Sequence, residues 1–241
     1  MLLPYNIFFV TLLLPLLIVN MIRWTYMHPT LHAASARIRT SIPELCAQIL
    51  LVFIVPIILI NTGVLPIQHR VAILTVLVGL LFIVLIMEKW NFKMLGFGKV
   101  SRKAMLAYTL FTLAGVALIA VTGRHIGTPI EGSWWQYPHF LYLFFLVSAT
   151  QEIAYRGYLM PALATFEKSP VALILTNAAL FTFLHSIFPN YLMNLPLAFV
   201  GGIAFAWIYL KYPNTLLIIL SHAVLNFAAV WYGFFTLAGG L

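Results

Sequence analysis

Long apolar runs follow one another along most of this chain, separated by short polar connections. They occupy residues 4–22, 43–61, 71–87, 104–122, 139–160, 171–188, 195–210 and 215–237. Each is close to the ~20 residues that a helix needs to cross the hydrocarbon core of a bilayer. Prolines lie at or near several of the ends, as is typical where helices start or stop. The sequence therefore predicts an all-α fold, a polytopic transmembrane bundle of about eight helices.

The composition supports a membrane protein. Of the 241 residues, 63% are hydrophobic and only 7% are charged. A soluble domain of this length needs far more charge on its surface. No internal repeat and no soluble domain separates the runs, so residues 1–241 are expected to form a single membrane domain. The first run lacks a small-residue cleavage site and is expected to be a retained span.

The basic residues are distributed unevenly between the two sides of the predicted bundle. With eight spans, one side carries nearly all of them in the odd-numbered connections, and the other side has only Arg70 and Arg124. The positive-inside tendency then predicts a multi-pass protein of the cell membrane with cytoplasmic basic loops and both termini outside. The formal charge of +8 does not indicate nucleic-acid binding, because the basic residues are not gathered on one amphipathic face.

Polar side chains inside the C-terminal runs are the strongest functional signal. An ionisable residue at membrane depth is costly and usually faces a protein interior or a water-filled cavity. The residues concerned are Gln151, Glu152 and Arg156 in the fifth run, His185 in the sixth, and His222 and Asn226 in the eighth. Three such clusters on separate helices indicate one shared polar site.

Glu152 and Arg156 are four residues apart, with the acid on the N-terminal side, which is the better orientation for a helical ion pair. A purely structural ion pair is therefore one reading of these two residues, and a part in chemistry is the other. Gln151 is turned by about 100° around the helix from Glu152. It can face a cavity while its neighbour faces a partner helix.

The two buried histidines each share a helix face with other candidates. Phe181 and His185 are four residues apart, as are His222 and Asn226. An imidazole beside a carboxamide supplies two donors that could stabilise a developing oxyanion. The structural alternative is that these polar groups only bridge helices, as polar residues do in membranes.

Several proteolytic arrangements are excluded by the residues present. The chain has no aspartate for an aspartyl dyad and no His-Glu-x-x-His motif for a zinc protease. Ser148 and Ser221 lack a glycine-flanked nucleophile context. What remains is a water-activating site built from a carboxylate and imidazoles. No cofactor is required, and zinc bound by His185, His222 and a carboxylate is the metal alternative.

Three spaced motifs in the C-terminal part resemble those of a known family. The motifs are Gln151-Glu152-x-x-x-Arg156 followed by Gly157-Tyr158-Leu159, then Phe181-x-x-x-His185, then His222-x-x-x-Asn226. They resemble the signature motifs of the CPBP family of intramembrane proteases, which includes the type II CAAX prenyl endopeptidases and the Abi proteins linked to bacteriocin immunity. The resemblance makes 139–237 the expected CPBP-like catalytic core.

The resemblance implies a hydrolase that cleaves a peptide bond in a membrane-anchored or lipid-modified peptide or protein. In the family, the first acid of the first motif activates water together with the histidine of the second motif. The last histidine and asparagine form the oxyanion site. The matching positions here are residue 151, His185, His222 and Asn226, with Glu152 and Arg156 as structural support.

Position 151 departs from the family pattern, because glutamine stands where the motif has glutamate. A carboxamide cannot accept a proton at neutral pH, although it keeps the shape of the carboxylate. The resemblance therefore implies an impaired catalyst. One reading is a non-catalytic scaffold, immunity or regulatory protein, and the other is an isosteric substitution that makes an inactive mutant. A near-isosteric change beside intact motifs favours the second.

Two further expectations concern geometry and an alternative class. In the predicted spans, Gln151 and His222 lie about two turns from the cytoplasmic ends. His185 lies toward the external end of its run, so the three can meet only if that helix is tilted, shifted or longer.

A small transporter would fit intramembrane charges, but the chain lacks paired broken helices in two related halves.

Overall fold

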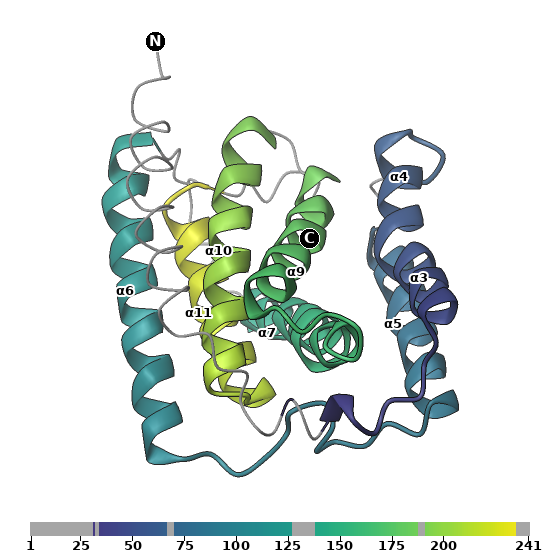
Figure 1. The fold of residues 1–241 in the computed structure, drawn as a ribbon. Coiled ribbons are helices and arrows are strands. Elements are labelled where there is room, and N and C mark those ends of the chain that lie inside the picture. The colour runs from purple at the N-terminus through teal and green to yellow at the C-terminus, as the bar shows by residue number, and fades with distance from the viewer. Residues whose placement is uncertain (1–30, 32–33, 67–69, 127–137, 188–190, 235–241) are drawn as a thin grey trace.

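The computed structural model describes residues 31, 34–66, 70–126, 138–187 and 191–234 (Figure 1). In this part of the chain the fold is entirely helical and has no strand. It has seven helices when the segments that follow one another without a break are counted as one helix. The segments are α3 (Ile42–Ile49), η1 (Leu50–Ile54), α4 (Val55–Asn61), α5 (Arg70–Met87), α6 (Arg102–Ile126), α7 (Pro138–Glu152), η4 (Ile153–Leu159), α8 (Met160–Leu163), α9 (Pro170–Leu184), η5 (His185–Ile187), α10 (Tyr191–Lys211) and α11 (Thr215–Trp231). Segments η1 and η4 are π-helical stretches, and η5 is a 3-10 turn.

The all-helical fold is confirmed, whereas the count of eight spans stays a prediction. Seven of the predicted runs coincide with helices, and the run 4–22 lies outside the described residues. Four helical stretches are long and apolar enough to cross a membrane, namely Ile42–Asn61, Arg102–Arg124, Pro170–Ile187 and Asn194–Lys211. Thr75–Met87 and Thr215–Trp231 are shorter apolar helices. Their length and composition make this a membrane protein.

Several helices begin at signals that are present in the sequence. The Ser169 hydroxyl accepts a hydrogen bond from the backbone of Ala172 ahead of α9, and the Asn214 side chain accepts one from Leu217 ahead of α11. Before α3, the Glu44 carboxylate accepts from both the backbone N–H and the hydroxyl of Ser41. Such caps satisfy backbone donors that the helix itself leaves unpaired.

One long helix lies across the others. Segments α7, η4 and α8 form a continuous helical stretch that is seen nearly end on in Figure 1, whereas α6 and α10 run up the picture. Helix α11 packs against both α6 and α7, and α10 packs against α9. The sequence suggested that run 171–188 had to be tilted, shifted or longer for the candidate residues to meet. In the structure, run 139–160 turns across the bundle.

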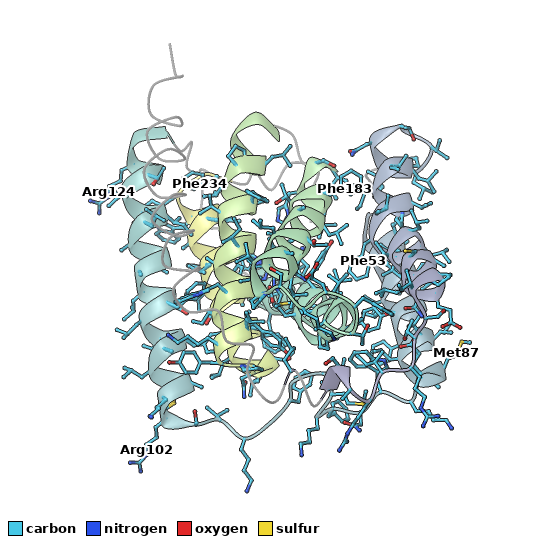
Figure 2. All side chains as sticks on the ribbon, viewed as in Figure 1. Phe53, Met87, Arg102, Arg124, Phe183 and Phe234 are labelled. Carbon is cyan, nitrogen blue, oxygen red and sulfur yellow. The ribbon has the colours of Figure 1, made fainter. Side chains whose placement is uncertain are left out.

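Basic residues gather at one end of the bundle. Arg102 and Met87 are labelled at this end in Figure 2, and Arg124 lies at the opposite end. The connection between α5 and α6, which carries Lys93 and Lys99, runs along the end marked by Arg102 (Figure 1). Arg102 and Arg124 therefore lie at opposite ends of the bundle, while the assignment of the basic loops to the cytoplasm stays a prediction.

Helix α5 ends in a turn that places a lysine in left-handed backbone. Lys89 has φ 57°, its N–H donates to the Ile86 carbonyl, and the Trp90 N–H donates to the Leu85 carbonyl. This pair of bonds is the Schellman motif, in which glycine usually occupies the left-handed position. Because a Cβ disfavours that conformation, we expect Lys89→Gly to raise the free energy of unfolding by about 1 kcal/mol. Reversible unfolding in detergent micelles measures the change.

Gly63 serves as a control, because its substitution is expected to have the opposite effect on stability. It has φ +76°, and a Cβ built there meets no atom within 4 Å. Gly63→Ala should therefore lower the free energy of unfolding by about 1 kcal/mol through backbone strain alone. If Lys89→Gly destabilises the protein while Gly63→Ala behaves as expected, the lysine backbone is not strained as described.

Candidate active site

The central part of the site lies in a π-helical stretch. Residues Ile153–Leu159 form this stretch, with Arg156 at its middle. Such stretches are rare and are found frequently at functional sites. A Cβ added to Gly157 would lie 3.1 Å from the Leu95 carbonyl oxygen. The glycine therefore lets η4 pack directly against the loop that follows α5.

Glu152 connects two helices through one carboxylate oxygen. Its Oε1 accepts from Nη1 of Arg156 at 3.0 Å and from Nδ1 of His222 at 2.6 Å. Glu152 and Arg156 are fully buried, and His222 is 3% exposed. A buried carboxylate is tolerated when it is paired and hydrogen-bonded. The predicted ion pair is thus present, and His222 of α11 joins it.

Arg156 also contacts α9 and α10. Its Nη2 donates to the carbonyl of Gly202 at 3.2 Å. Its guanidinium lies over the ring of Phe181, 4.4 Å from the ring centre, and 5.3 Å from the centre of Phe205. A cation over an aromatic face is attracted by the ring quadrupole. The charge is therefore surrounded by Glu152 of the same continuous helix and by partners from α9 and α10.

A second hydrogen bond joins α7 to α11 one helical turn away. Nδ2 of Asn226 donates to the hydroxyl of Ser148 at 3.2 Å, and Ser148 is fully buried. Ser148 and Glu152 are four residues apart on α7, as are His222 and Asn226 on α11. Residues four apart share a helix face. The two polar contacts between α7 and α11 therefore lie one helical turn apart along each helix.

His185 is connected to this centre through Phe181. Its Nδ1 donates to the backbone carbonyl of Phe181 at 2.8 Å. The Phe181 ring lies 4.7 Å from the His185 ring and 5.8 Å from the His222 ring, measured between ring centres. A carbonyl or a carboxylate can only accept, so the Nδ1 atom of each histidine must carry the proton. In the neutral form of each imidazole, Nε2 is then the ring nitrogen that carries the lone pair.

Gln151 lies next to this network without a hydrogen bond to it. In the described part of the chain, its buried Oε1 has no hydrogen-bond partner, and neither does Oε2 of Glu152. Buried polar atoms are usually satisfied. These two adjacent side chains therefore retain acceptor capacity at the point where α7 continues into η4.

The structure thus joins some of the predicted residues directly and others indirectly. Direct contacts join Glu152, Arg156 and His222, whereas Asn226 bonds to Ser148 and His185 shares Phe181 with His222. The sequence placed the site between the fifth, sixth and eighth runs and did not include α10. The contribution of α10 comes from Gly202 and Phe205. The only signal for it was the glycine pair at 201 and 202, which is common in membrane helices.

The zinc alternative finds no support in the donor geometry. Among the residues that the structure describes, no three side chains of His, Cys, Asp or Glu are grouped so that they could hold a metal ion. His185, His222 and Glu152 therefore do not form the three-ligand set that the sequence allowed. The Nδ1 atom of each histidine is already engaged by a protein acceptor.

Close packing at Gly202 positions the carbonyl that Arg156 uses. A Cβ at Gly202 would lie 3.1 Å from Cα of Ala178 and 3.2 Å from Cδ1 of Phe181. Overpacking of this kind costs about 1–3 kcal/mol, and better helix propensity offsets about 1 kcal/mol of it. We therefore expect Gly202→Ala to lower the free energy of unfolding by up to about 2 kcal/mol.

The adjacent glycine is a matched control for this prediction. A Cβ at Gly201 meets nothing within 4 Å, so Gly201→Ala should leave stability unchanged or raise it by about 1 kcal/mol. Both variants are compared by reversible unfolding in the same detergent. Equal effects of the two substitutions would contradict a specific contact between α9 and α10 at Gly202.

Comparison with known proteins identifies the region that carries this geometry. Residues 133–228 match the family model described as type II CAAX prenyl endopeptidase Rce1-like. No curated protein and no solved structure matched the chain. The matched region contains the residues of this site, from Ser148 on α7 to Asn226 on α11. The resemblance seen in the three motifs is therefore confirmed: over residues 133–228 the chain is similar to the type II CAAX prenyl endopeptidase Rce1-like family.

Proposed function

We propose that this chain has the site of a glutamate-type intramembrane endopeptidase, whose activity Gln151 impairs. The proposed substrate is a membrane-anchored or lipid-modified peptide or protein. The observation that carries the proposal is the fully buried Glu152 carboxylate, which binds Arg156 and His222 within a bundle of apolar helices. The Rce1-like match at 133–228 supports the reaction class.

With glutamate at position 151, the proposed reaction starts from a water molecule held by that carboxylate and by Nε2 of His185. The carboxylate takes a proton as the water oxygen attacks the scissile carbonyl carbon, and the same proton then passes to the leaving amine. The Nδ1 contact of His185 with the Phe181 carbonyl supports this role, because it orients the ring and makes Nε2 the nitrogen that carries the lone pair. With glutamine the first proton acceptor is missing.

His222 and Asn226 are the proposed oxyanion donors. Asn226 uses one amide N–H for Ser148 and has a second for the substrate oxygen. His222 donates through Nδ1 to Glu152, and in its protonated form it can also donate through Nε2. Arg156 is proposed as a positioning residue, since it holds Glu152 in the place from which the carboxylate orients His222.

Cleavage of a membrane-anchored lipidated reporter peptide tests this proposal. The purified chain and its Gln151→Glu variant are reconstituted with the reporter, and mass spectrometry detects the products. Gln151→Glu should produce cleavage, whereas the matched Gln151→Ala control should not, because it supplies no carboxylate. A reporter that stays uncut by a folded Gln151→Glu variant under every condition would remove the hydrolase proposal.

A non-catalytic membrane scaffold, immunity or regulatory protein is the second candidate. The observation that favours it is Gln151 itself, the one departure from the motifs. In that case the same site binds a peptide without cutting it. Binding of the reporter should then be equal with glutamine or glutamate at position 151, and neither chain should release product.

A further inference from the structure

A second polar site lies at the end of the bundle where basic residues gather. A cavity of about 840 Å³ opens there between the start of α3, the end of α5 and the connection that follows α5. Its lining includes the side chains of Arg37, Arg39, Lys89, Glu44, Glu88 and Gln48. Three of these groups are cations and two are carboxylates. The proposed catalytic residues do not line this cavity.

The two carboxylates of the cavity are bound by neutral donors. Glu44 accepts from the backbone N–H and the hydroxyl of Ser41 at 2.7 and 2.8 Å. Glu88 accepts from the Gln48 amide at 2.6 Å and from the Trp90 indole N–H at 2.9 Å. Hydrogen bonds to a carboxylate stabilise its charged form and occupy its oxygens. Oε2 of Glu44 and both carboxylate oxygens of Glu88 are therefore hydrogen-bonded without any lysine or arginine.

The three cations of the cavity form no ion pair with its two carboxylates, and the cavity has a formal net charge of +1. In the described part of the chain, the ion pairs are those of Glu152 with Arg156 and His222, and none involves Arg37, Arg39 or Lys89. The hydroxyl oxygen of Thr40, which also lines the cavity, is buried and has no hydrogen-bond partner among the described residues. The cavity thus combines three unpaired cations with an unused hydroxyl.

Lys89 reaches the cavity from a strained position. It occupies the left-handed site of the turn after α5, where glycine is the usual residue. A glycine there would relieve the backbone but would remove the ammonium group from the cavity. The presence of a lysine is therefore explained by its side chain and not by the turn.

The cavity lies at the level where apolar helices give way to polar loops. The candidate span Ile42–Asn61 begins beside it, and the apolar stretch Thr75–Met87 ends directly before Glu88. Met87 is labelled at the same end of the molecule as Arg102 in Figure 2. The end of an apolar helix marks the membrane interface, where lipid headgroups lie. Basic side chains at this level attract anionic lipids.

We propose that this cavity binds the phosphate group of an anionic phospholipid headgroup. Arg37 and Arg39 supply planar guanidinium donors that suit phosphate oxygens, and Lys89 supplies a point charge. A volume of about 840 Å³ is in the range of small-molecule sites.

The cavity wall is hydrogen-bonded to the helix that carries Arg156. The hydroxyl of Tyr158 in η4 donates to the side-chain oxygen of Gln48, and its ring packs against Trp90 with ring centres 5.1 Å apart. A lipid that binds the folded protein stabilises it by mass action. We therefore expect bound anionic lipid to raise the melting temperature. This inference does not depend on the proposed proteolysis.

The test measures lipid binding to the purified full chain in neutral detergent. Native mass spectrometry counts bound phosphatidylglycerol, with phosphatidylcholine as the comparison lipid. The Arg37→Gln/Arg39→Gln/Lys89→Gln variant should lose about a hundredfold in affinity for phosphatidylglycerol, since each basic residue near an anionic surface contributes about fivefold. The matched control is Lys93→Gln/Lys99→Gln/Arg102→Gln, which removes the same charge outside the cavity. It should bind phosphatidylglycerol like the parent.

Lys89→Gly keeps the test decisive if the triple variant does not fold. This variant relieves the strained turn, so it should be more stable than the parent while it binds phosphatidylglycerol about fivefold more weakly. Equal losses in the triple variant and its control would overturn the proposal, as would equal binding of the two lipids. Saturable binding of inorganic phosphate without any uptake of phosphatidylglycerol would overturn the assignment to lipid.

Discussion

Glu152→Leu is expected to lower the free energy of unfolding by about 3–5 kcal/mol, because removing one partner of a buried ion pair leaves the other charge uncompensated. Arg156 would remain fully buried, with only the Gly202 carbonyl and aromatic rings around its charge. Arg156→Met should cost a similar amount, since it leaves the Glu152 carboxylate with His222 alone. Reversible unfolding in detergent micelles gives both values.

The double variant Glu152→Leu/Arg156→Met separates a charge effect from a packing effect. A buried pair replaced by apolar residues of similar volume is often neutral in stability. His222 would still lose the acceptor for its Nδ1 proton, which costs about 1–3 kcal/mol for a buried group. The double variant should therefore be more stable than either single variant. If the two single effects simply add, Glu152 and Arg156 are not coupled as their 3.0 Å contact indicates.

The positions of the helices could be predicted from hydropathy alone. The run 43–61 became the helical stretch Ile42–Asn61, and the run 71–87 became Arg70–Met87. Length and caps determine where a membrane helix begins and ends. The direction of a helix depends on the neighbours against which it packs. For this reason the crosswise path of α7, η4 and α8 was not predicted.

Only those contacts of the site that join residues of one helix could be predicted from the sequence. Glu152 and Arg156 are neighbours on one helix, so their ion pair follows from a spacing of four residues. The bond from His222 to Glu152 joins residues 70 positions apart and depends on how α11 packs against α7. The spacing of residues along the chain does not indicate that Arg156 and His222 bind the same oxygen of Glu152. The Gly202 carbonyl is a backbone group and has no side-chain signal at all.

The π-helical stretch was not predictable from residue types either. Ile153–Leu159 contains glycine, tyrosine and arginine in an apolar run, and these residues are compatible with an ordinary α-helix. The stretch is accompanied by tertiary contacts of its members. Gly157 lies against Leu95, and the carbonyl of Tyr155 accepts from Nδ2 of Asn177 at 2.7 Å. A helix whose hydrogen-bonding groups have partners outside the helix departs most easily from regular geometry.

The Gln151→Glu variant is expected to cleave a lipidated reporter about 10²–10⁴ times faster than the parent chain, the usual contribution of a general base. Adding His185→Gln to that variant should return the rate to near the parent level, because the Nε2 acceptor is then absent. Adding His222→Gln should reduce the rate by about 10²–10³ through loss of an oxyanion donor. Product formation under single-turnover conditions measures all three rates, with melting temperatures as the control for folding. The Nδ1 proton of His185 is bound by the Phe181 carbonyl, so the proposal requires Nε2 of His185 as the proton acceptor. Full activity of a folded Gln151→Glu/His185→Gln variant would therefore assign the water-activating role to a group other than His185.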